Sequence, residues 1–386
     1  MSKPELITEI REEISVKGPI PFVRYMEMAL YHPLYGYYAS PGEKIGWKGD
    51  YYTSSSVHPV FGELIAKQVL QMREVCEKAS SSNPEIIFTL VEMGAGKGTL
   101  CFDILNTIRR EAPGVFERLH YVIIEESRWL REKQAAWLGP IFSGQIRWED
   151  EIPQKLTGLV LSNELLDAFP VHRLRVGSDT IEEIYVDWEN DGFVEILGPP
   201  SSPRLQNYLR RLPFRFDRPT ELEINLKARD WVRQVGQALS RGFVLTIDYG
   251  YPEETLYSSR RPQGTFLCYH QHKTNEEPYE RVGEQDMTSH VDFTSLKRCG
   301  EEVGLSCLGF TDQCHFLMGL GISEKMAEPA ERMDQSAEAR QAFLAMKRLM
   351  APEEMGKVFK ILIQTKNLPA DIHLDGLQFK PFFRFS

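Results

Sequence analysis

The sequence predicts a doubly wound α/β fold, with a mostly parallel sheet covered by helices on both faces. Continuous apolar runs such as IIFTLVEM and LHYVIIEES alternate with helix-like stretches such as TLCFDILNTIRREA and WLREKQAAWL. This rhythm is typical of strands that are buried on both faces of a parallel sheet. A glycine-rich turn, GAGKG, also stands between the first of these strands and its helix. Such turns bring a backbone close to a ligand at the carboxyl edge of the sheet.

The elements divide the 386 residues into four expected segments. Residues 1–80 look helical, from spacings such as Phe22, Tyr25, Met26 and Ala29, and end in a segment that we expect to cover a cofactor. Residues 81–176 form the first part of the α/β domain. Residues 177–220 read as a β-rich insertion with a hairpin turn at ENDG.

The α/β rhythm resumes in the fourth segment, residues 221–386. There ELEINLKARDWVRQVGQAL reads as a helix, GFVLTIDYG as a strand and VFKILIQTK as a final strand. Between them, residues 251–290 are long and polar, and we treat them as a lid-like loop.

Composition excludes several classes of function. The formal net charge is −10, from 45 basic and 55 acidic side chains, which argues against a nucleic-acid partner. The six cysteines form no CxxC pair, so neither a zinc ribbon nor a redox dithiol is indicated. No apolar run is long enough for a membrane span, and the start MSKPELITEI resembles no leader. We therefore expect a cytoplasmic protein with no membrane partner.

The glycine turn selects among nucleotide ligands. GAGKGT lacks the spacing of a phosphate-binding P-loop, and Thr99 stands where the dinucleotide fingerprint needs its last glycine. The remaining pattern joins Glu92, Gly94, Gly96 and Gly98. It suits S-adenosylmethionine, which has no pyrophosphate, and the acid can face its positively charged amino-acid end.

The next two strands end in acids. Glu125 follows YVII, at the position where a carboxylate can accept hydrogen bonds from both ribose hydroxyls. Glu149 and Asp150 follow the third strand, QIRW, where an adenine could rest. Together with the turn, these residues predict a nucleoside-binding edge.

The turn LSNELLDAFP after the fourth strand carries candidate catalytic residues. Glu164 and Asp167 could clamp a guanidinium, because carboxylates pair well with its N–H groups. Asn163 is counted among the cofactor contacts. The alternative is that Asn163 caps a helix whose first turn contains the two acids.

A loop ahead of the α/β domain could fold over the cofactor. KGDYYTSS contains Gly49, Asp50, Thr53 and Ser54. The alternative is an ordinary surface turn.

Five further residues are candidate substrate contacts: Asp248 and Tyr249 at the end of a sheet strand, His272 in the long loop, and Asp286 and Asp292 in GEQDMTSHVDF. Asp248 could instead cap the strand end, and Asp292 the following helix. His270 and His272 form an HxH pair without a companion ligand at suitable spacing, so we predict no metal.

The chain resembles the MidA family. The resemblance rests on KGDYYTSSSVHPVFGELIA, VEMGAGKGTL, SNELLDAFPVHRL, DYGY, GEQDMTSHVDF, FLMGLGI and LMAPEEMGKVFKILIQTK, in this order along nearly the whole chain. The family implies a class I methyltransferase fold, S-adenosylmethionine, and symmetric dimethylation of a protein arginine on a core subunit of respiratory complex I.

The resemblance also implies roles for individual residues. Gly94, Gly96, Gly98 and Glu125 would bind the cofactor, the 48–55 loop would cover it, and Glu164 and Asp167 would lie beside the acceptor. Ala95 departs from the proline of many relatives, which leaves the turn less stiff. Eukaryotic relatives are mitochondrial, but we see no transit peptide here.

Two rival functions remain open, namely methylation of a small molecule or other side chain, and a non-catalytic assembly chaperone. A homodimer is also considered.

Overall fold

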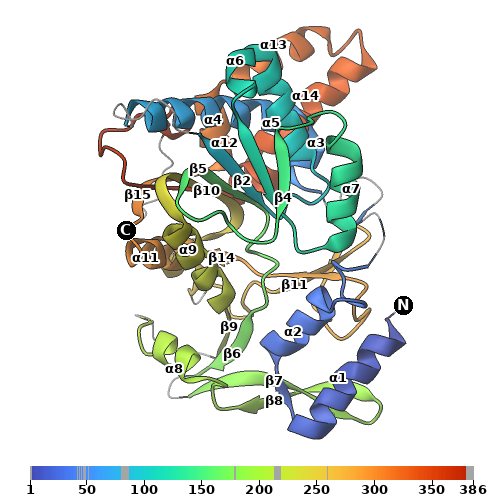
Figure 1. Cartoon of the computed structure of the whole chain (residues 1–386). Helices are drawn as coiled ribbons and strands as arrows, with labels where there is room; N and C mark the ends of the chain where they lie inside the picture. Colours follow the sequence, from blue (N-terminus) through green and yellow to red (C-terminus); the bar gives the residue numbers. More distant parts are fainter. Residues whose placement is uncertain are drawn as a thin grey trace.

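A computed structural model describes residues 2–40, 42, 44, 46, 49–50, 52–79, 87–177, 180–212, 219–258 and 260–379. Its central sheet has the strand order β15-β16-β10-β5-β2-β3-β4, with β14 paired to β10 (Figure 1). The strands are β2 (Thr89–Met93), β3 (His120–Ile124), β4 (Ile146–Glu149), β5 (Leu156–Asn163), β10 (Leu239–Tyr251), β14 (Val291–Asp292), β15 (Ser306–Asp312) and β16 (Phe359–Lys366). Strands β4, β3, β2, β5 and β10 are parallel, and β16 is antiparallel to its neighbours β10 and β15. The predicted doubly wound, mostly parallel fold is confirmed.

Helices cover both faces of this sheet because successive strand residues point to opposite sides. Leu159 and Leu161 of β5 pack toward α4 (Val60–Lys78), α5 (Thr99–Glu111), α12 (Gln313–Leu320) and α14 (Ala337–Met350). Val160 packs toward α9 (Leu226–Ala238) and α11 (Phe293–Glu301). The shorter or peripheral elements are α6 (Pro113–Phe116), α7 (Arg128–Leu138), α13 (Ile322–Arg332), η1 (Pro352–Gly356) and η2 (Asp375–Leu377).

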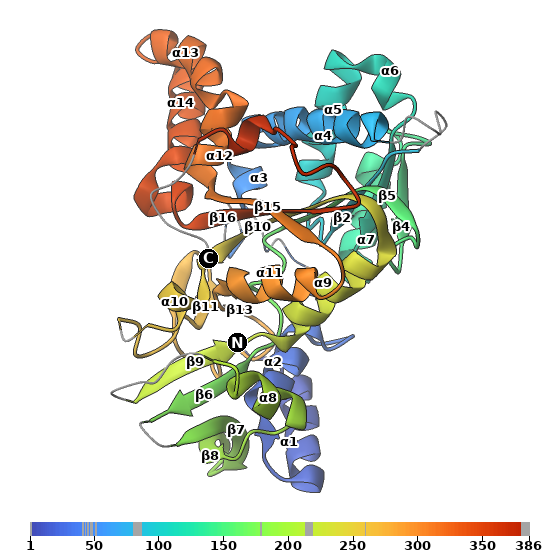
Figure 2. The ribbon, with the colours of Figure 1, turned by 90° about the vertical axis from the view of Figure 1, so that its left-hand side faces the viewer.

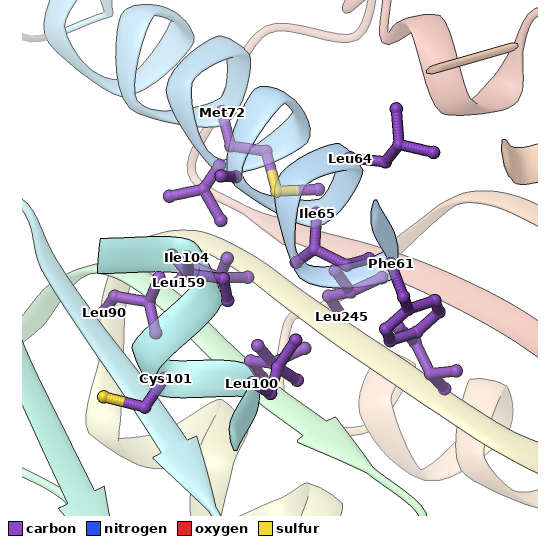
Figure 3. Close-up of a cluster of buried hydrophobic side chains, with 14 of the residues drawn as sticks. Phe61, Leu64, Ile65, Met72, Leu90, Leu100, Cys101, Ile104, Leu159 and Leu245 are labelled. Carbon is purple, nitrogen blue, oxygen red and sulfur yellow. The ribbon is translucent and has the colours of Figure 1, made fainter. Parts of the chain in front are cut away.

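Leu159 lies in the centre of this core and offers a test of its packing. Its side chain is fully buried, with Leu90 and Leu245 on the neighbouring strands and Ile104 of α5 close to it (Figure 3). Leu159→Ala is expected to lower the free energy of unfolding by about 2–5 kcal/mol, because the side chain leaves a cavity. Urea unfolding followed by circular dichroism measures this. The exposed Leu344→Ala should change the value by less than about 0.5 kcal/mol, and equal losses for both variants would contradict the packing.

A second sheet is assembled from distant parts of the chain. It pairs β1 (Ile20–Pro21), β7 (Ile181–Glu189), β6 (His172–Val176) and β9 (Thr220–Ile224), and β8 (Gly192–Gly198) joins β7. The expected turn at ENDG is present, and Asn190 and Asp191 both have positive φ, as a tight hairpin requires. The sheet therefore extends beyond the predicted insertion 177–220 on both sides, and α8 (Pro203–Leu209) follows β8.

The helix predicted to start at ELEI is wrong in its first residues. Thr220–Ile224 forms β9, which pairs with β6, and α9 begins at Leu226. Asn225 ends the strand and caps the helix, since its side chain accepts a hydrogen bond from the N–H of Ala228. Pairing with β6 thus outweighs the helical pattern.

The lid-like loop predicted at 251–290 is also corrected. This segment contains α10 (Glu253–Leu256) and a small antiparallel sheet of β12 (Lys273–Asn275), β11 (Leu267–His270) and β13 (Asp286–Thr288). Phe266, Cys268 and Met287 are buried against α1 (Pro4–Lys17) and α2 (Phe22–Tyr31). Helices α1 and α2 and the small sheet of β11, β12 and β13 together form what we call the N-terminal lobe. This lobe lies beside the second sheet (Figure 2). Its strands are too short and polar to be recognised from the sequence.

This lobe faces the carboxyl edge of the central sheet, because β5 and β10 run toward it and continue into β6 and α10 (Figure 1). Within the described residues, no helix combines the length and apolar character needed to cross a bilayer.

Candidate functional site

The glycine turn after β2 has the geometry that its sequence predicts. Gly94, Gly96 and Gly98 all have positive φ, at 70°, 56° and 81°, and α5 begins directly afterwards. A Cβ added to Gly94 would lie 2.7 Å from Leu165 Cδ1, and one added to Gly98 would lie 2.8 Å from Leu138 Cδ1. The positive φ values favour glycine at all three positions, whereas the two leucine side-chain ends could move aside for a Cβ.

Glu125 lies at the carboxyl end of β3, beside this turn. Its Oε1 accepts the N–H of Ser127 at 3.0 Å and its Oε2 accepts Gln134 Nε2 at 3.3 Å. Burial raises the pKa of Glu125 to about 7. A carboxylate has more acceptor positions than these two bonds use, so it can still accept bonds from a ligand.

Gln134 was not predicted from the sequence. It is fully buried on α7, donates to the carbonyl of Gly96 at 2.8 Å, and accepts from Trp148 Nε1 at 3.0 Å. Gln134 therefore forms hydrogen bonds to the glycine turn, to Glu125 and to Trp148 of β4. A glutamine inside a polar helix face gives no sequence pattern that reveals such a role.

The other predicted acids of this edge have different surroundings. Glu92 is buried and accepts a hydrogen bond from the Tyr121 hydroxyl at 2.7 Å, and burial raises its pKa to about 7. Glu149 and Asp150 are exposed at the end of β4, and Asp150 forms an ion pair with Arg131. Their contacts with a cofactor remain predictions.

The turn after β5 holds Glu164 in an unusual backbone conformation. Its φ is +54°, which side chains other than glycine rarely adopt, and its N–H donates to the carbonyl of Ile247. The side-chain Oε1 accepts the N–H of Ser54 at 2.7 Å and Asn163 Nδ2 at 3.1 Å. Burial raises the pKa of Glu164 to about 8. The backbone strain thus places this carboxyl at the sheet edge.

Asp248 supports this turn from the end of β10. It is fully buried, and its Oδ2 accepts the backbone N–H groups of Leu165, Leu166 and Asp167 at 3.3, 2.9 and 3.4 Å. Its carboxyl therefore holds the turn after β5, whereas the alternative considered from the sequence was a cap at the end of its own strand, and β10 continues to Tyr251. A direct contact between Asp248 and substrate stays a prediction.

Asp167 and Asp286 lie in the same buried region. Tyr249 donates its hydroxyl hydrogen bond to Asp167, and Tyr38 donates to Asp286 Oδ1 at 2.7 Å. Burial raises the pKa of Asp167 to about 6 and that of Asp286 to about 8, and the charge of Asp167 contributes to the latter shift. Asp167 Oδ1 is buried without a hydrogen-bond partner among the described residues.

Tyr269 of β11 stands among the three carboxyls. Burial, followed by the charges of Asp167, Asp286 and Glu164, raises its pKa to about 12. In the described part of the chain, no ion pair joins these three carboxyls to a lysine or arginine side chain. We call Glu164, Asp167 and Asp286 the acidic cluster. Asp167 and Asp286 are buried and Glu164 is half-buried. Lys44 acts on Asp286 through its charge without forming an ion pair with it.

The loop predicted to cover the cofactor contacts this cluster. Ser54 provides the N–H that binds Glu164, and Thr53 caps α3 (Ser54–Val57). Asp50 accepts the Tyr37 hydroxyl at 2.7 Å and the N–H of Gln271 at 2.8 Å, while Gly49 is buried in a turn. Residues 48 and 51 of the predicted loop lie outside the described residues. Contacts of Gly49, Asp50, Thr53 and Ser54 with a cofactor stay predictions.

The two remaining substrate candidates lie further out. His272 is exposed, its ring stacks on Tyr52 with centroids 4.4 Å apart, and its N–H donates to the carbonyl of Asp50. Asp292 caps α11 by accepting the N–H of Ser295 and also accepts the Tyr208 hydroxyl at 3.1 Å. Asp292 is therefore the N-cap of α11, which is the alternative that we considered from the sequence.

S-adenosylmethionine fits the residues at this edge. Glu125 retains acceptor capacity for ribose hydroxyls, and the glycine turn has no side chains that would block a close approach. Asn163 Oδ1 is buried without a hydrogen-bond partner among the described residues, so it can accept from an ammonium group. In the same part of the chain, no three His, Cys, Asp or Glu side chains are grouped as a metal site.

The raised pKa values predict how stability depends on pH. Glu164 and Asp286 have folded-state pKa values of about 8, far above their ordinary values of 4.5 and 3.8. Between about pH 6.5 and 8 the folded state thus holds protons that the unfolded chain has lost. Glu92, Asp103 and Glu125, whose pKa values burial raises to about 7, act in the same direction in the lower part of this window. The free energy of unfolding of the cofactor-free protein should therefore fall by about 2–3 kcal/mol per pH unit as the pH rises.

Urea unfolding at several pH values in this window measures the slope. Burial lowers the pKa of His290 to about 4, so this group changes the pH dependence of stability below the window. Burial lowers the pKa values of Lys44 and Lys360 to about 8, so these groups change it above the window. Glu164→Gln combined with Asp286→Asn should flatten the decline. An unchanged slope in this double variant would contradict the assignment.

Comparisons with known proteins agree with this site. Residues 64–311 match a family described as "Putative S-adenosyl-L-methionine-dependent methyltransferase". A structure of a relative from Burkholderia thailandensis, solved with bound S-adenosyl-homocysteine, superposes with a TM-score of 0.86 at 30% identity, covering 98% of this chain and 97% of that one. The "Protein arginine methyltransferase NDUFAF7 homolog, mitochondrial" of Drosophila melanogaster is 28% identical, covering 96% of this chain and 86% of the relative. The human protein of the same name is 26% identical, covering 92% and 82%.

The expected cytoplasmic location is contradicted by this comparison. The fly, frog and human relatives are all named as mitochondrial proteins.

The family match covers well over half of the chain, and the fold and the bound product of the Burkholderia relative agree with it. The chain therefore belongs to the MidA family and is an S-adenosylmethionine-dependent methyltransferase.

Proposed function

We propose that this enzyme transfers methyl groups from S-adenosylmethionine to an arginine side chain of a protein. The acidic cluster is the observation that carries the proposal. Glu164 and Asp167 share the turn after β5, and Asp286 stands opposite Tyr269 in the pairing of β13 with β11. No described lysine or arginine forms an ion pair with any of the three carboxyls. A guanidinium would supply the missing charge and, with its planar fork of five donors, can pair with two carboxylates at once.

The names of the relatives support the same substrate. Those from fly and human are called protein arginine methyltransferases. A subunit of respiratory complex I as the substrate, which the resemblance implies, is a finer prediction within this proposal, as is a homodimer.

In this proposal the cofactor residues hold and orient the methyl donor. Glu125 would accept the ribose hydroxyls, the glycine turn would approach the nucleoside, and Asn163 Oδ1 would accept from the amino-acid end. When bound, S-adenosylmethionine supplies a methyl group activated by its sulfonium.

The acidic cluster then prepares the acceptor. Glu164 and Asp167 would accept N–H bonds from the guanidinium and localise its positive charge, so that another nitrogen becomes nucleophilic. Forming the N–C bond would break the S–C bond of the sulfonium and release S-adenosyl-homocysteine, and the nitrogen would lose a proton. The bound guanidinium would keep Glu164 ionised, and Glu164 would then accept that proton. Asp248 and Tyr249 would keep the turn and Asp167 in place.

The product of the reaction tests the proposal. The purified chain is incubated with S-adenosylmethionine labelled in its methyl group and with protein extract of its source cells. The labelled protein is then hydrolysed and its amino acids are separated. Labelled methylarginine is expected, whereas label only on another side chain or on a small molecule would overturn the arginine assignment. No label above that of a reaction without the enzyme would favour the non-catalytic chaperone.

A further inference from the structure

A groove is bordered by the segment Tyr52–His58, whose residue Ser54 binds Glu164 of the acidic cluster. It has a volume of about 700 Å³ and runs between the segment Tyr52–His58 and helix α14. Tyr52 and Val57 form one wall. Ala342, Leu344 and Ala345 are on the other wall. Its size is in the range of sites that bind ligands.

The α14 wall is apolar in its centre and charged at its ends. Ala342 and Ala345 are three residues apart and so share one face of the helix, and Leu344 beside them is 51% exposed. Glu338 lies toward one end of the helix, and Arg348 lies toward the other, where it pairs with Glu354 at 2.8 Å. The groove thus offers an apolar surface bounded by both signs of charge.

The groove is joined to the proposed catalytic carboxyl through buried hydrogen bonds. Ser54 donates its N–H to Glu164 at 2.7 Å and its hydroxyl to Gln313 Oε1 at 3.0 Å. Gln313 in turn donates its Nε2 to the carbonyl of Leu349, near the end of α14, at 3.0 Å. Both Ser54 and Gln313 are fully buried. Helix α14, one wall of the groove, is therefore connected through Gln313 to Ser54, the residue that binds Glu164.

From this continuity we infer that the groove binds the polypeptide that presents the arginine, through an apolar side chain next to it in sequence. The inference rests on the proposed function. Ser54 binds Glu164 and belongs to the segment that borders the groove, so a polypeptide whose arginine reaches Glu164 has the groove near its next residues. A leucine-like neighbouring residue matches the apolar walls. The groove would then select which arginine of a protein is methylated.

Peptide kinetics test this. Each synthetic peptide contains one central arginine in a Gly-Ser background, with a single leucine placed in turn at each flanking position. With the wild-type enzyme, leucine at one position is expected to lower KM about tenfold relative to the all-Gly-Ser peptide, as burial of one leucine predicts. Leu344→Glu and the groove-filling Ala345→Trp should each abolish this preference while kcat on the Gly-Ser peptide is kept. Val16→Glu, on the 82%-exposed Val16 of α1, is the matched control and should keep the preference.

The outcomes separate the two proposals. Methylation of the arginine peptides with no leucine preference, or with a preference that survives both groove variants, would overturn the groove and leave the arginine activity standing. A methylated product that is not arginine would overturn the proposed function itself. If light scattering shows that Leu344→Glu changes a dimer into a monomer, the groove is an interface between two copies of the chain and the inference fails.

Discussion

Replacing Glu164 by glutamine is expected to slow methyl transfer about a thousandfold while S-adenosylmethionine still binds. Glutamine keeps an oxygen that can accept the Ser54 N–H, so the turn should fold normally. It loses the negative charge that orients the guanidinium and the carboxyl that takes its proton. Losses of this size are typical when a group that stabilises the transition state by its charge is removed. Initial rates with labelled cofactor and an arginine peptide that the wild-type enzyme methylates measure the change. Calorimetry with S-adenosyl-homocysteine measures binding.

A second carboxyl provides the control. Glu183 lies on β7 of the second sheet, is fully buried and pairs with His172 at 2.7 Å. Glu183→Gln should affect stability and leave the rate per folded molecule within about twofold. Undiminished transfer by Glu164→Gln would remove Glu164 from its catalytic role.

Reversing the charge of Glu125 is expected to abolish cofactor binding. Glu125→Lys removes the acceptor for two ribose hydroxyls, and hydrogen bonds to a charged group contribute about 1.5–3 kcal/mol each. A lysine would also repel the sulfonium and ammonium groups of the ligand. Affinity should therefore fall at least ~100-fold, which places binding beyond an ordinary calorimetric titration.

The neighbouring residue is the matched control for this variant. Glu126 follows Glu125 and is exposed, so Glu126→Lys makes the same change of charge with little loss of contacts. It should retain binding within about threefold. Saturable binding by Glu125→Lys, in a protein that unfolds at the normal temperature, would refute the ribose assignment.

The parts of the site that could be predicted from the sequence depend on short stretches of chain. Gly94 and Gly98 need positive φ within one turn, and Glu125 directly follows its strand. Because parallel strands end at one edge of a sheet, the positions of such residues follow once the strands are recognised. Glu164 and Asp167 were found for the same reason, since one turn contains both.

The parts that could not be predicted depend on tertiary packing. Tyr38 reaches Asp286 across 248 residues of chain, and Gln313 reaches Ser54 across 259. Their sequence surroundings suggest only a packed aromatic segment and a polar helix start. The role of Asp248 depends on the register in which Ile247 of β10 stands opposite Asn163 of β5, and this register becomes visible only in the folded sheet.

The way the N-terminal lobe is assembled has a consequence for the newly made chain. Helices α1 and α2 leave the ribosome first, but they pack against Phe266, Cys268 and Met287. At roughly 5–20 residues per second, these partners appear on the order of tens of seconds later. Val171 and Val186, which also pack against these helices, are made earlier. The apolar faces of α1 and α2 therefore stay partly exposed until residues 266–287 have been made, and chaperones that bind nascent apolar segments are expected to engage residues 4–31.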